Sequence, residues 1–90
     1  MSMTRKRALD INRRLCAGYF VINGLGCFTM PDLSDVSLQE AVEATKIIDA
    51  DPVVGRDGGG TIVTSTIAIE QVPYYFARII ERQVTNEVQN

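Results

Sequence analysis

The residues most suited to chemistry in this chain are three consecutive glycines, Gly58–Gly60, in the stretch GRDGGGTIV. A glycine-rich loop can hold a phosphate with its backbone N–H groups, but a P-loop also needs a lysine directly after its last glycine and a helix that follows. Here Thr61 follows Gly60 without a lysine, and the next residues are β-branched, which favours a strand. We therefore interpret the glycines as a solvated hairpin tip and expect no cofactor.

Metal binding and nucleophilic catalysis lack the residues that they usually need. The chain has no histidine, which is the usual base of a catalytic triad and a common metal ligand. Cys16 and Cys27 do not form a CxxC pair, and two distant cysteines cannot complete a zinc site within one chain. Glu40 and Glu43 could form an acid/base pair, but a solvated helix face does not tune carboxylate pKa values by burial. We therefore expect no metal and no enzymatic activity.

The bulk composition predicts a single small domain over residues 1–90, with frayed ends near 1–3 and 86–90. Its 90 residues are 46% apolar and 22% charged, with a net charge of −2, which is typical of a folded chain rather than a disordered one. No signal peptide or membrane-spanning apolar run is visible, so we expect a cytoplasmic protein with reduced cysteines and no membrane partner. Because a small and mainly aliphatic chain often buries surface against a second copy, we also expect a homodimer.

The N-terminal part predicts a helix from Thr4 to about residue 17. At 100° per residue, its apolar side is formed by Ala8, Ile11, Leu15, Tyr19 and Ile22. The pattern then breaks, and Asn23-Gly24 is a strong hairpin signal because both residues tolerate the positive φ angles of a type I′ turn. We expect a hairpin over residues 18–29, with a longer helix that ends at Gly24 as the alternative.

The middle of the chain predicts a loop followed by a second helix. Residues 30–37 form the loop, and Ser37-Leu38-Gln39-Glu40 matches a capping box. The helix should run to about Asp49, because Asp51 precedes a proline and is therefore disfavoured in the helical region. Its apolar side is formed by Leu38, Ala41, Val42, Ala44, Thr45 and Ile48, whereas Ile47 is placed on the wet side.

The last part predicts a second hairpin around the glycines and a final helix from Pro73. The β-branched runs on both sides of the glycines, residues 52–54 and 61–70, favour strands, and proline is tolerated in a first helical turn. The buried side of this helix is expected to contain Phe76, Ala77, Ile79, Ile80 and Val84. The fold class is therefore α+β, in the order α-ββ-α-ββ-α, with three helices on a small antiparallel sheet made of one or two hairpins.

Charge is distributed unevenly and suggests a first candidate surface. Residues 1–14 contain five Lys or Arg and one acid, whereas the rest contains four against ten. A basic face on the first helix could follow a phosphate backbone; its residues are Lys6, Arg7, Arg13 and Arg14. The chain is acidic as a whole, however, and few Asn or Gln residues accompany these arginines to read bases. Nucleic-acid binding is therefore the alternative function.

The leading hypothesis is a non-catalytic protein-interaction or regulatory module that binds a protein partner of unknown identity. Tyr74, Arg78 and Arg82 recur at every fourth position of the last helix, and tyrosine and arginine are enriched in interface hot spots. The acidic second helix offers Glu40 and Glu43, together with Ile47 as an apolar residue out of place. Either helix could form the partner-binding surface.

Overall fold

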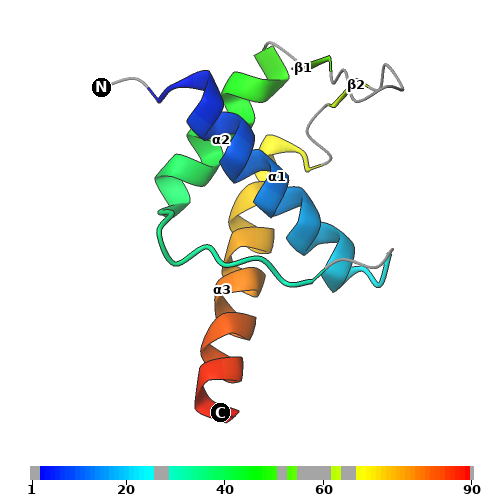
Figure 1. Ribbon diagram of the computed structural model, residues 1–90, viewed down its shortest axis with the longest axis vertical. Coiled ribbons are helices and arrows are strands. Elements are labelled where there is room, and N and C mark those ends of the chain that lie inside the picture. The colour runs from blue at the N-terminus through cyan, green and yellow to red at the C-terminus, as the bar shows by residue number, and fades with distance from the viewer. Residues whose placement is uncertain (1–2, 26–28, 51–52, 55–61, 64–66, 90) are drawn as a thin grey trace.

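Three α-helices form the body of the protein in its computed structural model (Figure 1). They are α1 (Arg5–Ile22), α2 (Leu38–Ala50) and α3 (Val72–Gln89), and a short 3-10 helix, η1 (Ile69–Gln71), leads into α3. The structure describes residues 3–25, 29–50, 53–54, 62–63 and 67–89, and it describes side chains for residues 3–25, 29–50 and 67–83. Within those ranges, none of the helices is both long and apolar enough to cross a membrane.

Helix α1 begins where the sequence predicts and ends later. Thr4 caps its first turn, because the Thr4 hydroxyl accepts a hydrogen bond from the Arg7 N–H at 3.1 Å. The hairpin predicted from residue 18 is wrong, since the helix continues to Ile22. Gly24, with a φ angle of +68°, ends it in a Schellman motif, in which the Gly24 N–H donates to the Val21 carbonyl and the Leu25 N–H to the Phe20 carbonyl. The Asn-Gly pair is thus a helix cap, and the longer helix is confirmed.

Helix α2 begins at the predicted capping box. The Ser37 N–H donates to Glu40 Oε1 at 3.0 Å, and the Glu40 N–H donates to Ser37 Oγ at 3.1 Å, so two otherwise unpaired donors are satisfied. The predicted apolar side is confirmed at its four buried residues, which are Ala41, Ala44, Thr45 and Ile48. Ile47 is not on the solvent-exposed side, where the sequence pattern placed it: it is half-buried and packs against the core. Leu38, by contrast, is 42% exposed.

The predicted α+β fold is wrong, because the described residues form an all-helical fold. Their extended pairing is confined to β1 (Val53–Val54) and β2 (Ile62–Val63), in which Val53 opposes Val63 and Val54 opposes Ile62. Two residues on each side do not form a sheet on which helices could lie, and the helices instead pack on one another. The predicted strand through residue 70 fails because Ile69–Gln71 is helical. The glycines Gly58–Gly60 lie outside the described residues, so their interpretation as a hairpin tip stays a prediction.

The core lies where the three helices meet. Ala8, Ile11 and Leu15 of α1 are fully buried, as the sequence predicts, and they join the buried side of α2. Helix α3 adds Val72 and Ile79, and Gly18 on α1 leaves room for Ile79 to approach closely. The segment between α1 and α2 closes the core with Leu33 and Val36. Of the residues predicted on the buried side of α3, Ala77 is exposed, and the Val84 side chain lies outside the described residues.

Candidate functional site

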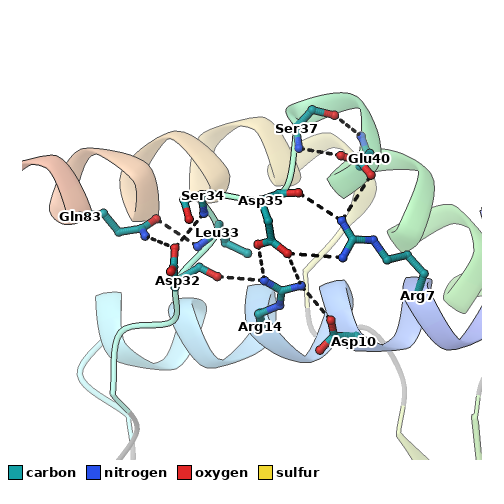
Figure 2. A network of polar contacts seen from close by, with 10 residues as sticks. All are labelled: Arg7, Asp10, Arg14, Asp32, Leu33, Ser34, Asp35, Ser37, Glu40 and Gln83. Carbon is teal, nitrogen blue, oxygen red and sulfur yellow. Dashed lines mark hydrogen bonds and ion pairs between the residues drawn. The ribbon is translucent and has the colours of Figure 1, made fainter.

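An arginine–carboxylate network joins α1 to the segment that precedes α2 (Figure 2). We define it as Arg7, Asp10, Arg14, Asp35 and Glu40. The Arg14 guanidinium lies between two carboxylates: Nη1 donates to Asp35 Oδ1 at 2.7 Å, and Nη2 donates to Asp10 Oδ2 at 2.8 Å. Arg14 also donates to the Asp32 backbone carbonyl at 3.0 Å. The Arg14 side chain is only 22% exposed, so most of this cation is committed to the fold.

Arg7 occupies the same side of α1, two turns before Arg14, and extends the network to α2. Its Nη2 donates to the Asp35 carbonyl at 3.2 Å and to Glu40 Oε2 at 3.4 Å. Arg7 is a candidate nucleic-acid-binding residue and Glu40 a candidate partner-binding residue, and the structure pairs these two with each other. Lys6 and Arg13, the other two residues of the basic face, are exposed.

Three carboxyl groups in or beside this network, those of Asp32, Asp35 and Glu40, have lowered pKa values. The hydrogen bond from Arg14 holds the pKa of Asp35 below its ordinary value, and the reciprocal contact raises the pKa of Arg14. For Glu40, the backbone N–H of Ser37 is the main cause of the lowered pKa, with Arg7 adding to it. The N–H of Ser34 likewise lowers the pKa of Asp32. In each case the ionised form is the one that accepts the hydrogen bonds.

Gln83 of α3 makes hydrogen bonds to the segment that precedes α2, which the arginines of α1 also contact. Its Nε2 donates to Asp32 Oδ1 at 2.7 Å, and its Oε1 accepts the Leu33 N–H at 3.2 Å (Figure 2). The segment over residues 32–37 is therefore held between α1 and α3 by charged and amide side chains. This arrangement has the character of a structural latch, since its charged groups pair within the chain, although the buried Arg14 Nε makes no hydrogen bond.

The network predicts a stability that falls at acidic pH. Because the folded-state pKa values of Asp32, Asp35 and Glu40 lie below their ordinary values near about pH 4, their contribution is complete above about pH 5 and is lost as the pH falls through the folded values. We expect urea midpoints to be constant from neutral pH to about pH 5 and to fall below it. Asp35→Asn should make the urea midpoint depend less on pH in the acidic range. Glu43→Gln removes an exposed carboxylate outside the network and should leave this pH dependence as steep as in the wild type. An equal pH dependence of the urea midpoint in the two variants would contradict the assignment of the acid sensitivity to Asp35.

A second cluster of polar and aromatic side chains joins the start of α3 to the end of α1. We call it the aromatic–arginine face and define it as Tyr19, Tyr74, Tyr75 and Arg78. The rings of Tyr74 and Tyr75 meet edge to face with centroids 5.1 Å apart, and Tyr75 lies 5.0 Å from Tyr19. The Arg78 guanidinium carbon lies 5.9 Å from the Tyr74 ring centroid, which is cation–π geometry. At 57% exposure, Tyr74 is the outermost ring of the cluster.

This face brings together two of the residues that the sequence proposes for partner binding, Tyr74 and Arg78. Arg82, one turn further along α3, is half-exposed, and Glu43 is exposed on α2. Sequence reasoning missed the contribution of Tyr19, which it counted on the apolar side of the N-terminal pattern but placed within the predicted hairpin over residues 18–29. The signal that could have found it is the Asn23-Gly24 cap, because a helix that reaches this cap brings Tyr19 close to Asn23. Asn23 donates from Nδ2 both to the Tyr19 carbonyl at 2.8 Å and to the Tyr75 hydroxyl at 3.4 Å.

The network pairs its charges within the chain, whereas the aromatic–arginine face presents its outermost ring to solvent. The chain matches no protein-family model, no curated protein and no solved structure. Its function is therefore inferred from its own residues. Among the described residues, no three histidine, cysteine or carboxylate side chains gather closely enough to hold a metal ion. Cys16 is half-buried beside Asn12, with its Sγ 3.8 Å from Asn12 Oδ1, and Cys27 lies outside the described ranges.

Proposed function

We propose that this protein is a small helical binding module that recognises another protein through its aromatic–arginine face. The observation that carries the proposal is the Tyr74 ring, which is 57% exposed although it is flanked by Tyr75 and Arg78. Tyrosine and arginine are the side chains most enriched at interface hot spots. A tyrosine has few rotatable bonds, so its ring loses little conformational entropy when a partner covers it.

The surroundings of Tyr74 support binding, because they hold the ring in place before a partner arrives. Three contacts connect Tyr74 to the body of the protein: an aromatic contact to Tyr75, the packing of Tyr75 on Tyr19, and the Arg78 guanidinium over the Tyr74 ring. Aromatic pairs at such separations contribute about 1 kcal/mol beyond their buried area. The positive charge of Arg78 further favours a partner that presents carboxylates or backbone carbonyls at this point.

Nucleic-acid binding through α1 is supported less well. Arg7 and Arg14 make ion pairs with Asp35, Asp10 and Glu40, so their charge is largely offset within the chain. A duplex would have to compete with these carboxylates for the guanidinium groups. Lys6 and Arg13 alone would release few counterions on contact with phosphates, which predicts weak affinity with a shallow salt dependence.

Affinity capture from a lysate of the source cells tests the proposal. Tagged wild-type protein should retain a stoichiometric protein partner after nuclease treatment, and Tyr74→Ala should reduce this capture at least about thirtyfold, as expected for a hot spot of about 2 kcal/mol. Tyr74→Phe keeps the ring and should retain most of the binding. Leu38→Ala, which removes another exposed apolar side chain from a different surface, should leave capture unchanged.

Two outcomes would contradict the proposal. Capture that is lost with Leu38→Ala but kept with Tyr74→Ala would place the partner on a different surface. Recovery of nucleic acid, together with loss of all captured protein after nuclease treatment, would favour the α1 surface. Circular dichroism melting curves of each variant show whether a loss of capture is a loss of folding.

A further inference from the structure

An apolar groove lies between α3 and the segment that leads into α2. It has a volume of about 370 Å³. Leu33 and Val36 are the buried apolar residues of its lining, and Phe76 and Ile80 on α3 are half-buried. Leu38, at the first position of α2, also lines it with 42% of its surface exposed. The groove is separate from the aromatic–arginine face, with which it shares no residue.

Helix α3 also projects beyond the other described helices at its C-terminal end. Its 18 residues reach Gln89, and in Figure 1 the red C-terminal end projects past α1, α2 and the segment between them. No described segment lies beside this end in that view. Helical turns without tertiary contacts are marginal in water, because most helix stability in proteins comes from packing an apolar face. The projecting end therefore lacks a packing surface among the segments that the structure describes.

We propose that the groove is a self-association site that receives the projecting end of α3 from a second copy of the chain. Because α3 is itself one wall of the groove, a twofold axis across α3 near Gln83 would place two α3 helices antiparallel. The end of each helix would then lie along the groove of the other. This single twofold rotation covers both grooves and both helix ends. Because the contact is isologous, association stops at a dimer.

The lengths agree with this arrangement. At a rise of 1.5 Å per residue, the groove wall from Phe76 to Gln83 extends about 10 Å, and the helix from Gln83 to Gln89 extends about 9 Å. The projecting end is thus about as long as the groove that would receive it. The rim is compatible with a packed helix as well, since Ser34 and Ser37 are small and Leu38 already presents apolar surface outward.

Sedimentation analysis of the full-length protein over a wide range of concentrations tests this inference. The wild type should sediment as a mixture of monomer and dimer in equilibrium, without larger species. Leu38→Glu should raise the dimer dissociation constant at least about tenfold, because it would place a charge in the lining of the apolar groove. A glutamate is well tolerated by the fold at this first position of α2, where the helix dipole favours negative charge. Leu25→Glu is the matched control: Leu25 is 49% exposed, lies outside the groove and should leave the dissociation constant unchanged.

The inference stands apart from the proposed function, and Tyr74→Ala separates the two. This variant should lose the protein partner and keep the dimer, whereas Leu38→Glu should lose the dimer. A wild type that stays monomeric at the highest concentrations would overturn self-association. A dimer that resists Leu38→Glu, or that Tyr74→Ala dissociates, would overturn the groove as its site. Melting curves that match the wild type exclude misfolding of the variants, and Leu38→Gln provides an uncharged second substitution at the same position.

Discussion

Gly18→Val is expected to lower the free energy of unfolding by about 3 kcal/mol, because it overpacks the contact between α1 and α3. A Cβ at position 18 would lie 2.7 Å from Ile79 Cγ1 and closer still to Ile79 Cδ1. Ile79 is fully buried, so it cannot swing into solvent to make room. The larger valine also adds two methyl groups to a site that has no free volume for the first carbon. Urea unfolding followed by circular dichroism at 222 nm measures the loss.

Two further variants isolate the cause. Arg13→Val introduces the same β-branched side chain at an exposed position of α1, where only helix propensity is lost, and it should cost less than about 1 kcal/mol. Combining Gly18→Ala with Ile79→Val removes the methyl group that the new Cβ meets first, so the pair should show a favourable coupling of about 1 kcal/mol. Equal losses in Gly18→Val and Arg13→Val would mean that α3 does not approach α1 at Gly18.

Leu33→Ala should also be costly, at about 3 kcal/mol, although Leu33 lies in an irregular segment. Its side chain is fully buried among the residues of the three helices, and its backbone N–H is held by Gln83. Truncation would leave a cavity that the clamped segment cannot easily fill. Leu38, five residues later, is 42% exposed, and Leu38→Ala should change stability by no more than about 0.5 kcal/mol. Thermal and urea unfolding of both variants give the comparison, and similar values for the two would contradict the placement of Leu33.

The helix starts could be predicted from the sequence because they depend on local hydrogen bonds. Ser37 and Glu40 form a capping box wherever a helix begins between them, and Thr4 likewise caps α1 from its own side chain. The buried side of α1 through Ala8, Ile11 and Leu15 follows from its 3.6-residue period. These features require no knowledge of the rest of the chain.

The end of α1 and the fold class could not be predicted in the same way. Gly24 supplies a positive φ angle in either a hairpin or a Schellman cap, and tertiary contacts decide between them. Tyr19 packs on Tyr75, and Ile79 packs against Gly18, so residues far apart in the sequence favour the longer helix. The β-branched residues near Ile67 favour strands only when a sheet is present to pair with them. Here the helices bury Ile67 instead.

In the candidate surfaces, too, contacts within one helix could be predicted from the sequence, whereas contacts between distant segments could not. The spacing of Tyr74 and Arg78 brings them together on α3, as one helical turn requires. The basic pattern of α1 is also real, but its meaning depends on Asp35, which lies more than twenty residues from Arg7 and Arg14 in the chain. No helical period reveals that these cations already have carboxylate partners. Charge patterning alone therefore does not show which of these cations are paired within the chain.

The most direct test of the binding-module account is the footprint of the captured partner on isotope-labelled protein, measured by amide and side-chain NMR shifts. We expect the largest changes at Tyr74 and Arg78, with smaller ones at Tyr19 and Tyr75, which support the exposed ring. Lys6 and Arg13 should be unaffected, and the Arg14 side chain should keep its contact with Asp35. A footprint centred on Lys6 and Arg13, with no change at Tyr74, would contradict the account.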